Sequence, residues 1–277
     1  IARWDGSSWH SLGAGVNHIV DAIAVSDSDV YVGGQFTQAG GSPASRIARW
    51  DGSSWYPLGS GVGVYSPFVA ALAVSGSDLY AGGSFSMAGG ASAHSIGRWD
   101  GSSWYSLGSG AESGLNDQGR TLAVSGSDVY VGGYFTRAGG ITVNYIARWD
   151  GSNWHALGSG VGYKVFAIAV SGSDVYVGGQ FTQAGGSPAN NIARWDGSSW
   201  HALGSGVGGP SLTWVNAIAV SGSDVYVGGW FTEAGGSPAN NIARWNDNSN
   251  AWYALGTGMN NMVRTIAVSG TDVYVGG

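Results

Sequence analysis

Residues 167–206 read AIAVSGSDVYVGGQFTQAGGSPANNIARWDGSSWHALGSG, and near copies of this stretch follow one another along the whole chain of 277 residues. The first glycine of its double glycine recurs at Gly33, Gly82, Gly132, Gly178, Gly228 and Gly276, with spacings of 49, 50, 46, 50 and 48 residues. A repeat of this length is typical of an array of supersecondary units. We therefore expect a single domain over residues 1–277.

Each repeat contains four short apolar segments that are separated by turn residues. In residues 167–206 these segments are AIAVS, DVYVGG, IARWD and SWHALG. Apolar residues are consecutive in the first two, so both faces of these strands must be covered, as they are between stacked sheets. An Asp-Gly turn joins the last two and favours a two-residue hairpin. The repeat predicts an all-β fold, a β-propeller with four antiparallel strands in each blade.

The two ends of the chain carry complementary halves of one repeat. The chain begins with IARWDGSSWHSLG and stops with IAVSGTDVYVGG. We therefore expect a six-bladed ring whose last blade takes its outer two strands from the N-terminal segment and its inner two from the C-terminal segment, a closure that removes exposed sheet edges. Because the chain does not start with Met, we also expect it to be processed or to be part of a longer chain.

Tryptophan and arginine recur at fixed places in the repeat. Twelve of the 14 tryptophans occupy the third and fourth segments, at positions 4, 9, 50, 55, 99, 104, 149, 154, 195, 200, 245 and 252. Large aromatic residues dominate core energetics, so these twelve are predicted to pack between blades. The arginine of each IARW or IGRW segment is predicted to pair with a turn aspartate, because an unpaired and partly buried guanidinium is costly. The alternative for these arginines is a sixfold anion-binding ring.

The repeat resembles the kelch repeat and the propeller of the galactose-oxidase family. The shared features are a Gly-Gly at the end of the second strand, RWD in the third, and a Trp before a Leu in the fourth. The phrase VGGxFTxAGG is similar to bacterial surface-propeller repeats. The resemblance implies the architecture and not an activity, since propellers host many functions. Galactose oxidase uses a cysteine-crosslinked tyrosine with copper, which a chain without Cys cannot build, and the DGSSW turns are one residue too short for a sialidase Asp box.

Composition narrows the classes of partner. A net charge of −6 and a single lysine argue against nucleic acid, which requires clustered cations. No segment has the length of a transmembrane helix, so no membrane insertion is expected. We predict no metal and no cofactor, since Cys is absent and His exchanges with Tyr after the hairpin Trp. The Gly/Ser/Thr-rich, lysine-poor composition favours a secreted or cell-surface bacterial protein that is a monomeric ring.

Functional residues are expected where the repeats differ from one another. The largest differences lie in the connections between the fourth strand of one repeat and the first strand of the next, and loops on a rigid scaffold often bind ligands. The candidates are His18, Tyr65, Phe68, Glu112, Asn116, Asp117, Arg120, Tyr163, Lys164, Trp214 and Arg264 in these connections, and Tyr134 and Trp230 after a double glycine. Trp214 and Trp230 are the two tryptophans outside the repeated positions. Flat aromatic faces beside polar groups suit recognition of sugars or peptides.

We therefore predict a non-catalytic recognition or scaffold protein that binds carbohydrate or protein through these loops. Three alternatives remain open. A lectin could use equivalent pockets in every blade, a hydrolase-like enzyme could use the acidic loop around Glu112 and Asp117, and a structural or engineered ring could bind nothing.

Overall fold

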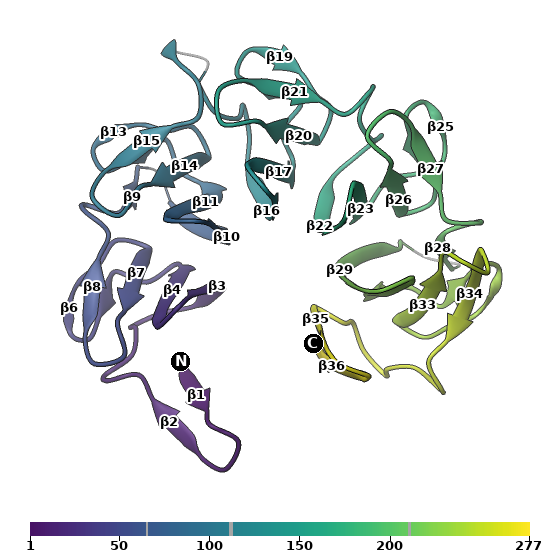
Figure 1. Ribbon diagram of the computed structural model, residues 1–277, viewed down its shortest axis with the longest axis horizontal. Helices are drawn as coiled ribbons and strands as arrows, with labels where there is room; N and C mark the ends of the chain where they lie inside the picture. The colour runs from purple at the N-terminus through teal and green to yellow at the C-terminus, as the bar shows by residue number, and fades with distance from the viewer. Residues whose placement is uncertain (65, 111–112, 210–211) are drawn as a thin grey trace. The chain divides into compact units, whose positions relative to one another are not determined.

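The computed structural model describes residues 1–64, 66–110, 113–209 and 212–277, and its regular elements there are β-strands, with no α-helix among them. Its main sheets have four strands each, which follow one another in chain order and pair antiparallel (Figure 1). The all-β prediction and the four strands per repeat are confirmed in the five complete sheets of the described residues.

The four strands of a sheet correspond to the four segments of the repeat. First strands are β3 (Val20–Ser26), β10 (Phe68–Ser75), β16 (Gly119–Ser125), β22 (Val165–Ser171), β29 (Trp214–Ser221) and β35 (Thr265–Ser269). Second strands are β4 (Asp29–Gly34), β11 (Asp78–Ser84), β17 (Asp128–Gly133), β23 (Asp174–Gly179), β30 (Asp224–Trp230) and β36 (Asp272–Gly276). Third strands are β1 (Ala2–Trp4), β7 (Ile47–Trp50), β14 (Ile96–Trp99), β20 (Ile146–Trp149), β26 (Ile192–Trp195) and β33 (Ile242–Asn246). Fourth strands are β2 (Trp9–Ser11), β8 (Trp55–Pro57), β15 (Trp104–Ser106), β21 (Trp154–Ala156), β27 (Trp200–Ala202) and β34 (Ala251–Ala254).

The chain divides into two compact units. Unit 1 comprises residues 1–129, 137–141 and 149–154, and unit 2 comprises residues 130–136, 142–148 and 155–277. Unit 1 contains the sheets β3-β4-β7-β8 and β10-β11-β14-β15, and unit 2 contains β22-β23-β26-β27 and β29-β30-β33-β34. Two-stranded sheets lie at the two chain ends, β1-β2 in unit 1 and β35-β36 in unit 2. The six-bladed closed ring therefore stays a prediction.

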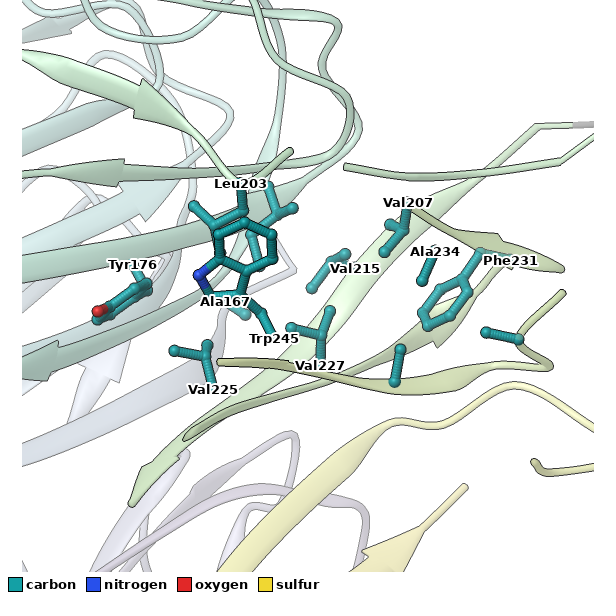
Figure 2. Packing of buried hydrophobic residues seen from close by; sticks show 13 residues of the cluster. Ala167, Tyr176, Leu203, Val207, Val215, Val225, Val227, Phe231, Ala234 and Trp245 are labelled. Atoms are coloured by element: carbon teal, nitrogen blue, oxygen red, sulfur yellow. The ribbon is translucent and has the colours of Figure 1, made fainter. Parts of the chain in front are cut away.

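Hydrophobic cores form between successive sheets, as the consecutive apolar residues predicted. In unit 2, Val225 and Val227 of β30 are fully buried and lie in one cluster with Tyr176 of the preceding sheet (Figure 2). In unit 1, Leu72 and Val74 of β10 pack against a cluster that includes Ile47 of the preceding sheet. Each sheet thus covers a face of its neighbour within a unit, and burial of these apolar faces stabilises the stack.

The repeated tryptophans form pairs that also link successive sheets. The two rings of each pair lie 5.4–5.6 Å apart between centroids. The indole N–H of the second tryptophan donates a hydrogen bond of 2.8–2.9 Å to the leucine carbonyl after the preceding fourth strand. These bonds are Trp55 to Leu12, Trp104 to Leu58, Trp154 to Leu107, Trp200 to Leu157 and Trp252 to Leu203. Packing between repeats is confirmed at these positions.

Trp4 and Trp9 do not follow this pattern, because they are 50% and 70% exposed. The prediction of packing is wrong for them in this structure. The reason is that the equivalent Trp50 and Trp55 pack at Leu12 and Gly13, after the fourth strand of the preceding repeat, and no repeat precedes β1 and β2 in unit 1.

The predicted ion pair between the repeated arginine and a turn aspartate is confirmed for four of the arginines, whereas Arg3 in β1 pairs with no carboxylate of the described residues. Arg49 binds Asp29 at 2.8 Å and Arg98 binds Asp78 at 2.9 Å. Arg194–Asp174 and Arg244–Asp224 are longer, at 3.3 and 3.2 Å. These aspartates begin the second strand, so each pair ties the third strand to the second across the sheet and uses up the charge that an anion ring would need.

The Asp-Gly turn differs from the two-residue hairpin that was predicted. Trp50 pairs with Trp55, which leaves a four-residue loop, Asp51 to Ser54. The Asp51 carboxylate accepts hydrogen bonds of 2.8 Å from the Ser53 and Ser54 backbone N–H groups and from the Ser53 hydroxyl. The aspartate side chain therefore organises the loop as an Asx turn, and this local bonding outweighs the Asp-Gly preference for a shorter hairpin.

Small hairpins between the second and third strands were not predicted. They are β5 (Gln38–Ala39) with β6 (Ser42–Pro43), β12 (Met87–Ala88) with β13 (Ala91–Ser92), β18 (Arg137–Ala138) with β19 (Ile141–Thr142), β24 (Gln183–Ala184) with β25 (Ser187–Pro188), and β31 (Glu233–Ala234) with β32 (Ser237–Pro238). The connecting strands β9 (Val62–Gly63) and β28 (Val207–Gly208) add to two of them. These pairings fix each connection against the loop that follows the double glycine.

Candidate ligand-binding surface

The end of each sheet where the first strand begins carries most of the candidate residues, and we call it the bulge end. The first and second strands pair there with a register shift, for example between Val165 and Ala167 in β22 and between Val215 and Ala217 in β29. One residue of each first strand therefore has no partner in the second strand. It is Phe166 in β22 and Asn216 in β29. Such β-bulges re-aim side chains and are frequent beside functional sites.

The backbone at the bulge end is fixed by the second glycine of the double glycine. A Cβ on Gly179 would collide with the Lys164 carbonyl oxygen, and one on Gly229 would collide with that of Trp214. The Gln180 N–H then donates to the Lys164 carbonyl at 2.9 Å. Only glycine permits this approach, so residues 164 and 214 hold a fixed backbone position whatever side chain they carry.

Trp214 and Trp230 lie opposite each other at the bulge end of the β29–β30 pair, where their Cα atoms are direct partners. Trp230 is 39% exposed and Trp214 is partly buried. Their predicted proximity is confirmed. Both lie outside the hydrophobic cluster of this sheet, which contains Val215 and Val227 instead.

A second group of aromatic residues surrounds Lys164 in unit 2. The Lys164 ammonium nitrogen lies 4.4 Å from the ring centroid of Tyr134 and 5.1 Å from that of Tyr163. Tyr134 makes an edge contact with Phe166, with 6.0 Å between the ring centroids. Tyr163 makes one with Tyr145, with 5.7 Å between the centroids. Three sequence-predicted candidates, Tyr134, Tyr163 and Lys164, are therefore brought together. Phe166 and Tyr145 were missed, although both also interrupt the repeat.

The candidates in unit 1 are more dispersed. The Arg120 guanidinium lies 5.5 Å from the ring centroid of Phe68, a cation–π contact at the bulge end. His18 is exposed. Asp117 is also exposed and accepts a hydrogen bond from the next backbone N–H, at 2.7 Å.

Four further candidates complete the set. In unit 1 the Asn116 carboxamide accepts a 2.9 Å hydrogen bond from the Arg137 backbone N–H. Arg264 of unit 2 is exposed, and its backbone N–H binds the Gly276 carbonyl at 2.8 Å. Tyr65 and Glu112 lie outside the described residues, so the predicted pair of Glu112 with Asp117 has no structural counterpart here.

A cavity of about 270 Å³ near Asn116 was not predicted. It is lined by His94, Ser113, Gly114, Leu115, Asn116, Arg137 and Gly140. His94 occupies the place of Asn144 and Asn190 in other repeats and, like them, binds a loop carbonyl, that of Ser113, at 2.9 Å. Ligand pockets usually measure about 300–1,000 Å³, so this cavity is small. The hydrogen bond of His94 to the Ser113 carbonyl stabilises the loop.

The remaining histidines that the structure pairs contact turn aspartates. His10 Nε2 lies 2.6 Å from Asp5, and His201 Nε2 lies 2.6 Å from Asp196. The Ser7 and Ser8 N–H groups hold the pKa of Asp5 well below its usual value, and His201 is the largest cause of the lowered pKa of Asp196. Within the described ranges no three His, Cys, Asp or Glu side chains gather as a metal-binding group, and no helix is long and apolar enough to cross a membrane.

Comparison with known families gives one clear result. Three segments match a β-propeller family model. They are residues 26–50, 174–195 and 224–250, and the model describes a domain of unknown function (DUF5122) that is a β-propeller. The matched segments run from the end of a first strand or the start of a second strand to the third strand or just beyond it, including the small hairpin. The repeat is thus a β-propeller repeat, and the match does not extend to the kelch or galactose-oxidase type.

Among solved structures, the chain is similar to the computationally designed Ika8 protein. The two share 14% sequence identity, with a TM-score of 0.47 over 95% of this chain and 94% of that one. A comparison with curated proteins gave no match.

Proposed function

We propose that this protein is a non-catalytic recognition module that binds carbohydrate at the bulge end of unit 2. The observation that carries this proposal is the concentration of unrepeated aromatic side chains there, on backbone positions that the repeat itself keeps fixed. Tyr163 and Trp230 are 42% and 39% exposed. Exposed rings stack on the C–H face of a sugar, and nearby amide groups bind its hydroxyls.

The test is a glycan-array screen of the intact chain, followed by calorimetry of any hit. Trp214→Ile and Trp230→Gln are suitable variants, because the equivalent repeat positions already carry Ile19 and Gln35. Both should weaken binding at least tenfold and leave the melting temperature nearly unchanged. Tyr253→His is the matched control, since it removes an exposed aromatic residue outside the bulge end where other repeats have His. Several equal sites per chain would favour a blade-repeated lectin, and absence of any glycan binding would overturn the proposal.

We also propose a six-bladed, kelch-like propeller whose last blade combines the two terminal half-repeats. Two uncovered surfaces support this arrangement. In unit 1, Ile23 and Val25 of β3 are 53% and 63% exposed, whereas the equivalent Leu72 and Val74 of β10 pack on the preceding sheet. In unit 2, Tyr274 of β36 is 59% exposed, whereas the equivalent Tyr176 is 2% exposed.

Composition supports three further proposals. We propose that the module works outside the cell or at its surface, without catalysis or a cofactor, and as a monomer. Low charge and a high content of Gly, Ser and Thr are the support. A protein ligand in place of a glycan is the alternative partner.

A further inference from the structure

Lys164 is the only lysine in the sequence. Its charged group makes different contacts from those of the arginines in the same unit. Arg194 and Arg244 of the same unit are held by Asp174 and Asp224. In contrast, Lys164 makes no ion pair with a carboxylate of the described residues. Its contacts are with the faces of two tyrosine rings, at 4.4 and 5.1 Å.

The rings hold the ammonium group at the surface without neutralising it. Cation–π attraction at partly exposed sites is about 0.5–1 kcal/mol, which orients the side chain and leaves its full positive charge. Tyr134 and Tyr163 are themselves braced by Phe166 and Tyr145. Lys164 is partly buried and Tyr163 is 42% exposed, so an ammonium group and a partly exposed aromatic ring lie next to each other.

From this juxtaposition we infer that the ligand is an acidic saccharide, whose carboxylate or sulfate group binds the Lys164 ammonium while its sugar ring stacks on Tyr163. This inference rests on the proposed carbohydrate-binding function. The Lys164 ammonium can donate a charge-assisted hydrogen bond to the anionic group, and such bonds are about twice as strong as neutral ones. The protein carries a net charge of −6, so selection of an anion must come from this local group and not from long-range attraction.

The sequence offers matched variants for this lysine. Lys164→Ile places the residue of Ile19 at the same fixed backbone position and removes the charge, and Lys164→Arg keeps the charge. Arg137→Gln removes one positive charge from unit 1 and installs the residue of the equivalent Gln38 and Gln183. It therefore controls for a general change in net charge.

The experiment is calorimetry of the intact chain with a galacturonic acid oligosaccharide, its neutral methyl ester and a sulfated disaccharide. We expect an acidic probe to bind at least tenfold more tightly than the ester. Lys164→Ile should abolish that preference, Lys164→Arg should retain most of it, and Arg137→Gln should leave it unchanged. Tight binding of the sulfated probe alone would identify sulfate as the anionic group.

Three results would overturn the inference. Equal binding of the acid, the ester and the sulfated probe, or binding of neutral glycans alone, would reject the acidic ligand while the carbohydrate-binding function stands. A preference that survives Lys164→Ile in a folded variant, as judged by its melting temperature, would reject the role of the lysine. Binding of no glycan on the array would reject the proposed function itself, and the inference with it.

Discussion

The turn aspartates show how one oxygen atom organises a loop. Asp51 and Asp100 each accept two backbone hydrogen bonds and a serine hydroxyl at 2.8 Å. Asn246 takes the same place in a later repeat, and its carboxamide oxygen accepts from the Ser249 N–H at 3.0 Å. The loop therefore requires an acceptor oxygen, and the negative charge adds dependence on pH.

That dependence can be measured. Hydrogen bonds from Ser53 and Ser54 lower the pKa of Asp51 to about 2, and those from Ser103 and Ser102 lower the pKa of Asp100 to about 2. Because the folded-state pKa lies below the unfolded value, the stabilisation is complete above about pH 4 and is lost as the pH falls through 2. We expect the double variant Asp51→Asn, Asp100→Asn to melt like the parent at pH 6 and to lose less stability between pH 4 and pH 2. An unchanged acid dependence would contradict this account.

The two unrepeated tryptophans provide a test of surface against core. Replacing both Trp214 and Trp230 with Ala should leave folding intact, because their sheet has its hydrophobic cluster elsewhere. Substitutions at exposed positions usually change stability by about 0.5 kcal/mol or less. Because Trp214 is partly buried, its substitution should cost more stability than that of Trp230. Thermal melting of the parent and the variant measures the effect. A loss of several kcal/mol would assign these rings to the core.

At the scale of elements, the fourth strand of each repeat is tied to its neighbour by the tryptophan N–H. Trp104 is 8% exposed and donates to the Leu58 carbonyl at 2.9 Å. Trp104→Phe keeps an aromatic ring but removes this hydrogen bond between sheets. The Leu58 carbonyl still accepts from the Gly61 N–H at 3.0 Å, so the loss should be about 0.5–1.5 kcal/mol. Urea unfolding should show this loss, while Trp230→Phe should shift the midpoint little. Equal effects of the two substitutions would mean that the hydrogen bond between sheets adds nothing.

The strands of the sheet were predictable because the apolar pattern of each repeat is regular. The bulge at Phe166 and the hairpin of Gln183 and Ala184 were not, because neither has an apolar periodicity. Sequence variation pointed to Tyr134, Tyr163 and Lys164, but not to the contacts among them. Those contacts depend on the bulge and on the collision that excludes any other residue at Gly179. Tyr145 could have been found by the same comparison of repeats, since Asn191 and Asn241 occupy its place.

For the whole molecule, the proposed closure gives the uncovered strands of unit 1 a defined role. A groove of about 340 Å³ lies between the N-terminal segment and β3, lined among others by Ile1, Arg3, Ile23, Val25 and Trp50. Its wall includes Ile23 and Val25, whose counterparts Leu72 and Val74 are covered by the preceding sheet.

Deleting Ile1 to Gly13 tests this arrangement. If the terminal half-repeats form one blade, the deletion removes its outer strands and the acceptor carbonyl of Leu12, and the melting temperature should fall sharply. A sharper comparison is Ile23→Ser against Leu72→Ser. Closure predicts that both cost several kcal/mol, since each would bury a hydroxyl in an apolar contact. An unchanged melting curve after the deletion, or a harmless Ile23→Ser, would contradict the closed ring.

The carbonyl of residue 164 lies against Gly179, where no side chain fits. The backbone position of residue 164 is therefore inherited with the repeat, whereas its side chain can change independently. The same backbone place carries Ile19, Phe68, Lys164 and Trp214 in different copies. Duplication of a repeat therefore also duplicates this fixed backbone position. A single substitution there alters what the surface recognises without changing the backbone. These side chains could also be exchanged between repeats by design, so that each bulge end of one scaffold carries its own binding residue.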